Sequence, residues 1–238
     1  MKVSEALGIK PKNEKNKRKR YVSLVVIITG ILSIGFAIIS FYGLQTGTFA
    51  MTMRAEAKKK GIQLSETLDF ENYTTRLFSN PTMDALDITY IDLNIEEAVN
   101  TNGKYTDPNL EYVAYTFYVR NSGREMINLN YTIKLYDVYE DLDEGIRILV
   151  IEDDLNGTVT EEMYQKPDEV EKEYYNMPDA IEFLDDELVT NKTVPKFQIG
   201  QVRKITFFMW IEGQDSEDYM LSGGVKFRME FSVMNADV

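Results

Sequence analysis

The side chains best suited to chemistry in this chain are carboxylates, because its 238 residues include no His and no Cys. Without imidazole or thiolate, the chain cannot build a Ser-His-Asp or Cys-His catalytic centre, a His/Cys zinc site or a thiolate-held iron–sulfur cluster. Carboxylates instead gather at residues 140–144, 152–154, 185–187 and 215–218. The chemistry open to such clusters is calcium binding or acid–base catalysis by paired carboxyl groups.

One cluster partly imitates a calcium-binding loop. With Gly157 at the sixth loop position, the first, third and fifth positions carry oxygen-bearing side chains. The twelfth position lacks the bidentate Glu that such loops require, and a Glu comes one residue early. The candidate calcium ligands are therefore Glu152, Asp154, Asn156 and Glu162. The simpler interpretation of Asn156-Gly157 is a turn that closes a β-hairpin.

A second candidate site surrounds the only Trp of the chain. Trp210 ends an apolar run and is followed by Glu212 and then by Gly213. The pattern favours a Trp packed in the core, and the alternative is a ligand-facing aromatic ring beside Glu212. No Gly-rich phosphate loop precedes a helix. We therefore expect no catalytic activity and no cofactor, with calcium as the one candidate.

Charge and hydropathy divide the chain into segments. Residues 1–20 carry eight basic and two acidic residues, or +6, so the rest of the chain holds −13 − 6, or −19. The following uncharged stretch is long enough to span a hydrocarbon core, and Tyr21, Phe41 and Tyr42 suit its two interfaces. A cleaved signal peptide would have a shorter apolar region. The sequence thus predicts a cytoplasmic basic tail, a transmembrane helix over residues 21–43 and an exported remainder.

The remainder is expected to be mainly β. Residues 44–60 are predicted as a membrane-proximal stalk with the first strand, and residues 61–238 as an antiparallel β-sandwich of jelly-roll or immunoglobulin-like type. Residues 126–139 alternate apolar and polar side chains, and residues 110–121 are rich in aromatic and β-branched types. The turn signal between these two runs predicts that they form a β-hairpin.

Two acidic segments interrupt the strand pattern. Residues 160–175 are expected to hold a short helix broken near Pro167, and residues 179–188 a short helix or an acidic loop on the rim of the sandwich. The core is expected to include Tyr115, Phe117, Ile133, Leu149, Phe207, Trp210, Phe227 and Phe231.

Four segments carry a resemblance to known proteins. They are YVAYTFYVRNSG (112–123), IRILVI (146–151), MWIEGQDSED (209–218) and GGVKFRM (223–229). In this order they resemble a group of uncharacterised, N-terminally membrane-anchored ectodomain proteins of Gram-positive (Firmicutes) bacteria. The resemblance implies a location and an architecture but no activity.

The layout is also similar to that of camelysin and TasA-type proteins, which place a hydrophobic segment before a cysteine-free β-sandwich. Camelysin is described as a metalloprotease, but this chain has no HExxH motif and no His, so that activity is not carried over.

The predicted function is that of a non-catalytic, membrane-anchored extracellular protein of a bacterial cell envelope, which binds a protein partner or assembles with its own copies. The alternative is a carboxylate-dependent surface hydrolase acting on cell-wall polymer. The expected location is the cell membrane, with the N-terminus cytoplasmic and the C-terminal domain extracellular, in contact with the lipid bilayer. Nucleic acid is excluded because the acidic body repels phosphate, and cationic partners or divalent ions are favoured instead.

Overall fold

The computed structural model describes residues 20–33, 47–80, 88–109, 111–167, 173–215 and 223–234. The chain divides into two units, Met1–Leu44 and Gln45–Val238.

The described part of the first unit is a helix over residues 20–33, with Tyr21 exposed. Among the residues with a described structure, no helix has both the length and the apolar character needed to cross a membrane. The predictions of a transmembrane helix over 21–43, of a single-pass membrane protein and of location in the cell membrane are therefore wrong. Phe41 and Tyr42, the other predicted interface residues, lie outside the described residues.

The second unit is mainly β, as predicted, and in its described part the strands form two sheets. Sheet A has the strand order β10-β6-β12-β1-β3. Its strands are β1 (Gly47–Met53), β3 (Arg76–Phe78), β6 (Ile127–Tyr139), β10 (Leu188–Phe197) and β12 (Gly224–Met234). The predicted first strand is thus β1, which lies inside this sheet and not in a stalk.

Sheet B has the order β2-β5-β11-β7-β8-β9, and β4 also pairs with β5. Its strands are β2 (Ile62–Ser65), β4 (Gly103–Thr106), β5 (Val113–Asn121), β7 (Ile146–Asp153), β8 (Val159–Gln165), β9 (Ala180–Glu182) and β11 (Val202–Ile211). The short helices are α3 (Ala55–Lys59), η1 (Tyr90–Asp92), α4 (Ile95–Asn100) and α5 (Leu142–Gly145). The pairs β1–β12 and β8–β9 are parallel, which departs from the predicted antiparallel jelly-roll or immunoglobulin-like sandwich.

The predicted hairpin of residues 110–121 with 126–139 is wrong, because β5 belongs to sheet B and β6 to sheet A. The connection crosses from one sheet to the other. Buried Asn121 holds it by donating from Nδ2 to the carbonyls of Glu125 and Phe197, both at 3.0 Å. A Cβ on Gly123 would lie 2.0 Å from the carbonyl oxygen of Lys60, so only glycine fits this crossing. The alternation of β6 correctly showed its buried face, but it carried no information about the partner strand.

The two acidic segments also differ from the prediction, since their described residues form β8, β9 and the start of β10 in place of helices. In β8, Met163 and Tyr164 are buried although the strand begins with the exposed residues Val159, Thr160 and Glu161. Packing of these two side chains outweighs the local preference for a loop.

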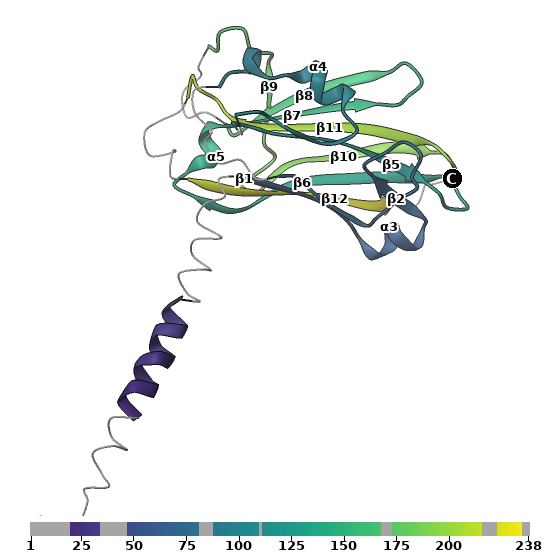
Figure 1. The fold of residues 1–238 in the computed structure, drawn as a ribbon. Helices are drawn as coiled ribbons and strands as arrows, with labels where there is room; N and C mark the ends of the chain where they lie inside the picture. Colours follow the sequence, from purple (N-terminus) through teal and green to yellow (C-terminus); the bar gives the residue numbers. More distant parts are fainter. Residues whose placement is uncertain are drawn as a thin grey trace, which may run out of the picture. The chain divides into compact units, whose positions relative to one another are not determined.

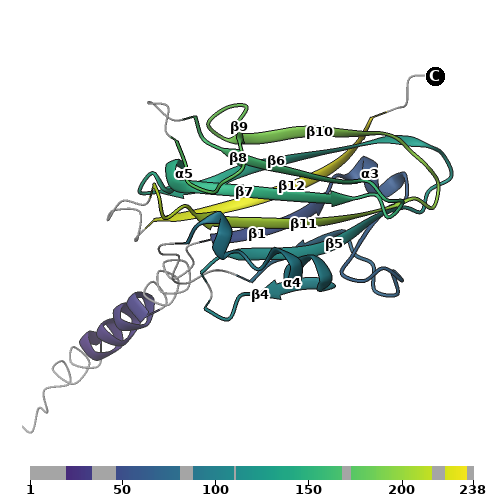
Figure 2. The ribbon, with the colours of Figure 1, turned by 90° about the horizontal axis from the view of Figure 1, so that it is seen from above.

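The core has two parts, because sheet B is buried on both faces. Between the sheets, Phe49 of β1 stacks on Phe207 of β11 with ring centroids 3.6 Å apart. The outer face of sheet B carries a second cluster that includes Leu149, Phe208 and Trp210. Figure 1 shows the two sheets as layers with α4 over the outer side of sheet B, and Figure 2 places α4 beside β4 and β5.

All eight predicted core residues are buried, at 2% exposure or less. Six of them lie between the sheets, whereas Leu149 and Trp210 belong to the second cluster.

Replacing Phe207 with Ala should lower the free energy of unfolding by about 3–5 kcal/mol, since it removes a fully buried ring that stacks between the sheets. Urea denaturation of the full chain measures this change. Val159→Ala, at a position that is 61% exposed, is the control and should stay within about 0.5 kcal/mol of wild type. Equal effects of the two substitutions would contradict the packing described above.

Candidate functional site

Two of the predicted calcium ligands lie in an internal ion cluster, which we call the Lys192 cluster. It consists of Tyr131, Glu152, Glu162, Tyr164 and Lys192. Lys192 is opposite Tyr131 in the β10–β6 register, and its side chain extends toward sheet B. Its ammonium pairs with Glu162 and lies 3.8 Å from Glu152. Tyr131 donates a hydrogen bond to Glu152, and Tyr164 donates one to Glu162. The cluster therefore joins the two sheets through a cation between two carboxylates.

Burial and hydrogen bonding shift the pKa values of Tyr131, Tyr164 and Glu162 in this cluster. Burial and the neighbouring Glu152 raise the pKa of Tyr131 well above its usual value, and burial with Glu162 raises that of Tyr164. Burial alone would raise the pKa of Glu162, but the hydrogen bonds from Lys192 and Tyr164 outweigh it and hold this pKa below its usual value. Both phenols therefore act as donors toward carboxylate acceptors.

The other two predicted ligands are used in the β7–β8 turn. Asp154 accepts hydrogen bonds from the backbone N–H groups of Asn156 (2.8 Å) and Thr158 (3.0 Å), which lower its pKa. The side chain of Asn156 donates to the carbonyl of Asp154. The hairpin interpretation of Asn156-Gly157 is confirmed by the antiparallel pairing of β7 with β8. In the described part of the chain, no three His, Cys, Asp or Glu residues form a group that could hold a metal ion. Calcium binding thus stays a prediction, without a common site for its four ligands.

Trp210 occupies the core position that the sequence favours, at 1% exposure. Its indole N–H donates to Glu212 at 2.9 Å, and Glu212 is itself fully buried. The second oxygen of Glu212 accepts from the side chain of Gln214 at 3.1 Å. Gln214 in turn bonds the backbone N–H and carbonyl of Tyr175. Glu212 therefore helps to anchor a neighbouring loop through Gln214.

A second chain of contacts holds the same loop, and it starts from a residue that the sequence analysis missed. Arg147 of β7 is fully buried opposite Trp210, and its guanidinium pairs with Asp215. The ring of Tyr174 lies 4.9 Å from that guanidinium, and its hydroxyl donates to Asp215 at 2.7 Å. A single Arg inside the apolar run IRILVI was the available signal, because a buried charge requires a partner.

These contacts frame a cavity of about 590 Å³, which we call the Tyr174 cavity. It is lined by Gln165, Glu173, Tyr174, Met177, Pro178, Asp179 and Ala180. Its volume lies within the usual ~300–1,000 Å³ range of ligand sites. Apolar side chains, an aromatic ring and two carboxylates suit an alkyl chain that ends in an ammonium or guanidinium group.

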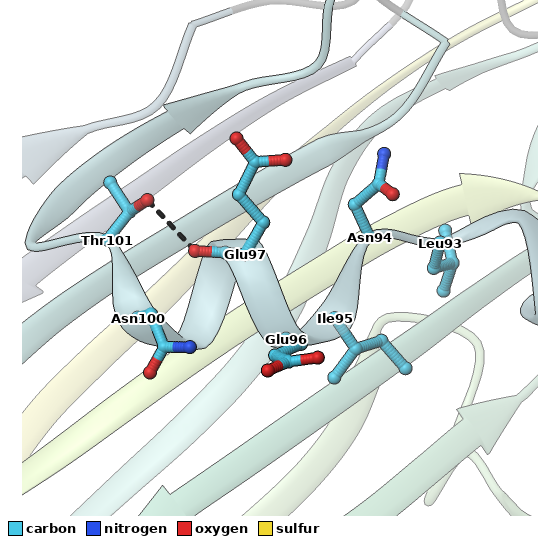
Figure 3. Close-up of a pocket in the computed structure, with 7 residues that line it drawn as sticks. All are labelled: Leu93, Asn94, Ile95, Glu96, Glu97, Asn100 and Thr101. Carbon is cyan, nitrogen blue, oxygen red and sulfur yellow. Dashed lines mark hydrogen bonds between the residues drawn. The ribbon is translucent and has the colours of Figure 1, made fainter.

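A groove of about 580 Å³ lies along α4. Figure 3 shows Glu97 and Asn94 projecting to one side of the helix and Glu96 and Asn100 to the other. The carboxylate of Glu97 already accepts a hydrogen bond from Tyr105 at 3.1 Å. Because the polar groups do not converge on one point, this groove is the weaker candidate.

Comparison of the chain with protein-family models, with curated proteins and with solved structures finds no match. The resemblance to Gram-positive ectodomain proteins and to camelysin and TasA-type proteins therefore stays a prediction.

Replacing Lys192 with Met should destabilise the fold at pH 7 by about 1–3 kcal/mol, because it leaves two carboxylates without their cation. We expect a smaller loss of stability than for a fully buried ion pair, since Lys192 and Glu162 each keep 29% of their side chains exposed. Urea denaturation at several pH values measures the effect.

The pH dependence of this variant tests the cause. In wild type, the lowered pKa of Glu162 adds stability above pH ~4.5 that is lost as the pH falls below it. Without Lys192, burial dominates and raises the pKa, so protonation should stabilise the variant. The difference in unfolding free energy between wild type and Lys192→Met should therefore narrow between pH 7 and about 4.5. A difference that is constant over this range contradicts the proposed cause.

Replacing Arg147 with Met should destabilise the fold by about 3–5 kcal/mol, because it leaves Asp215 buried beside Tyr174 without its cation. The double variant Arg147→Met/Asp215→Leu should lose less than the sum of the two single variants, by at least ~1 kcal/mol. Chemical denaturation of the four proteins measures this coupling. Additive losses would show that the two side chains do not act as a pair.

Proposed function

We propose that the sandwich is a non-catalytic binding domain that takes a lysine or arginine side chain of a partner protein in the Tyr174 cavity. The observation that carries this proposal is the framework behind the cavity. Asp215 accepts a hydrogen bond from the hydroxyl of Tyr174. The side chain of Gln214 accepts a hydrogen bond from the backbone N–H of Tyr175 and donates one to its carbonyl. A wall fixed in this way loses little conformational entropy when a ligand enters.

The charge of the cavity selects the ligand. Glu173 and Asp179 line it, and no ion pair is found for either among the residues described. A partner's alkyl stem would lie along Met177 and Pro178, with its charged head beside the carboxylates. The acidic character of the whole chain, −13, adds a long-range attraction for cationic partners.

The contacts of the Lys192 cluster support a role without catalysis. The two carboxylates that face the same cation, Glu152 and Glu162, are bound by Lys192 and by two tyrosine hydroxyls. Acid–base work on a substrate would require at least one of them to leave these partners. The carboxylate-dependent hydrolase therefore has no specific observation in its favour.

Fluorescence anisotropy of a fluorescein-labelled hexalysine peptide with the full chain tests the proposal. The double variant Glu173→Gln/Asp179→Asn should bind about tenfold more weakly, since exposed ion pairs contribute roughly 0.2–1 kcal/mol each. Glu56→Gln/Glu71→Gln removes the same charge from exposed positions elsewhere and should change the affinity less than about twofold. An equal loss of affinity in both double variants would show that hexalysine responds only to the net charge of the chain, and would contradict a binding site at the cavity.

A further inference from the structure

The outer face of sheet A carries a concentration of positive charge, which we call the basic face. It consists of Arg76, Lys134, Lys226 and Arg228. The alternation of the strands directs these side chains outward, since Ile133, Leu135, Phe227 and Met229 of the same strands are buried. A basic face is unexpected on a chain with a net charge of −13.

Two of these cations oppose each other directly. In the β12–β6 register, Arg228 is the partner of Lys134, and on its other side Arg228 pairs with Ala50 of β1. Directly opposed side chains on one face lie close together, with Cβ atoms about 4.5–5.5 Å apart, and like charges there are destabilising. The opposed charges of Lys134 and Arg228 therefore destabilise the free domain unless an anion lies over the two side chains.

The carboxylates on this face already have partners. Glu230 pairs with Arg54 at 2.5 Å, and Asp137 pairs with Lys226 at 2.9 Å. Neither Lys134 nor Arg228 has an ion pair within the described residues, although the guanidinium of Arg228 lies 4.6 Å from the ring centroid of Tyr136. The ring fixes the guanidinium without neutralising it. The positive charge of Lys134 and Arg228 is thus left for a group from outside the domain.

We propose that the basic face binds an acidic segment of a partner protein. Arg presents a planar fork of donors that matches a carboxylate in two parallel hydrogen bonds, and Lys134 beside it adds a second cation. The cations spread over β3, β6 and β12, so they suit an extended chain with several carboxylates and not a single small anion.

Charge distinguishes this occupant from two others. The net charge of the chain repels a polyphosphate more strongly than a short peptide with a few carboxylates, which disfavours nucleic acid. It also repels a second copy of the same acidic chain. The basic face is formed by sheet A, whereas the residues of the Tyr174 cavity come from β8, β9 and the loop before β9. This inference is therefore independent of the proposed function.

The first measurement is the affinity of the full chain for a fluorescein-labelled hexaglutamate peptide, by fluorescence anisotropy at low salt. Lys134→Gln/Arg228→Gln should weaken binding about tenfold or more, because two charge-assisted contacts are lost. Lys58→Gln/Lys104→Gln removes two exposed cations elsewhere and should change the affinity less than about twofold. Equal weakening by both double variants overturns the proposal.

Thermal unfolding separates binding from a structural role. Removal of the opposed charges should leave the melting temperature of Lys134→Gln/Arg228→Gln equal to or above that of the control variant. Hexaglutamate should raise the melting temperatures of wild type and of the control variant, but not that of Lys134→Gln/Arg228→Gln. A melting temperature clearly below that of the control would show that these cations serve the fold, and would overturn the proposal.

Two further probes examine the other occupants. If a twelve-nucleotide oligothymidine binds more tightly than hexaglutamate and depends on the same two residues, the face recognises polyanions of another class and the proposal is wrong. If sedimentation shows the chain alone to form a dimer that the double variant loses, a second copy is the occupant, and the proposal is equally wrong. A monomer that prefers hexaglutamate supports it.

Discussion

The arrangement of the domain depends on one constraint, which is that sheet B is apolar on both faces. In β7, successive residues alternate between two hydrophobic clusters, so that Val150 faces the space between the sheets and Leu149 the outer cluster. A sheet of this kind must be covered on both sides. Sheet A covers one side, and the other is covered by residues from η1, α4 and the surrounding loops. Sheet A itself needs only one buried face, and its outer face stays open for polar residues.

The same constraint explains why the buried charges are paired. Arg147 lies on a face of sheet B that is covered, so its guanidinium needs Asp215 and the ring of Tyr174. Lys192 comes from an edge strand of sheet A and meets two carboxylates of sheet B. These pairs join segments that are far apart in the sequence, and the Arg147–Asp215 pair also holds Tyr174 in the loop beside the cavity. The charges left for a partner are those at the surface, which include Glu173 and Asp179 at the cavity and Lys134 and Arg228 on the basic face.

The sequence was most informative where a local pattern decides the structure. Period-two alternation located β6, and the apolar residues Phe227 and Phe231 were correctly placed in the core. It did not identify strand partners, because pairing depends on contacts between distant segments, and the predicted β5–β6 hairpin failed for this reason. The apolar stretch after residue 20 suggested a membrane helix from hydropathy alone, and the described helix is too short for one.

For the candidate sites too, the sequence did not show which distant residues meet. Glu152 and Glu162 were recognised as a possible cation site, and the structure does place a cation between them, but it is Lys192 from a strand that no loop motif includes. The residues of the Tyr174 cavity carry no motif and become a site only through Arg147 and Asp215, which are 68 positions apart. For the basic face, the opposition of Arg228 to Lys134 became visible only from the register of β12 with β6, which no local pattern gives.

The basic face and the acidic Tyr174 cavity should bind peptides of opposite charge at two different places. Backbone amide chemical-shift mapping of the full chain, titrated in turn with hexaglutamate and hexalysine, tests this most directly. Hexaglutamate should move the amide signals of β6 and β12 around Lys134 and Arg228, and hexalysine those of residues 173–180. A single set of amides that responds to both peptides, or no response in β6 and β12 to hexaglutamate, would contradict this separation.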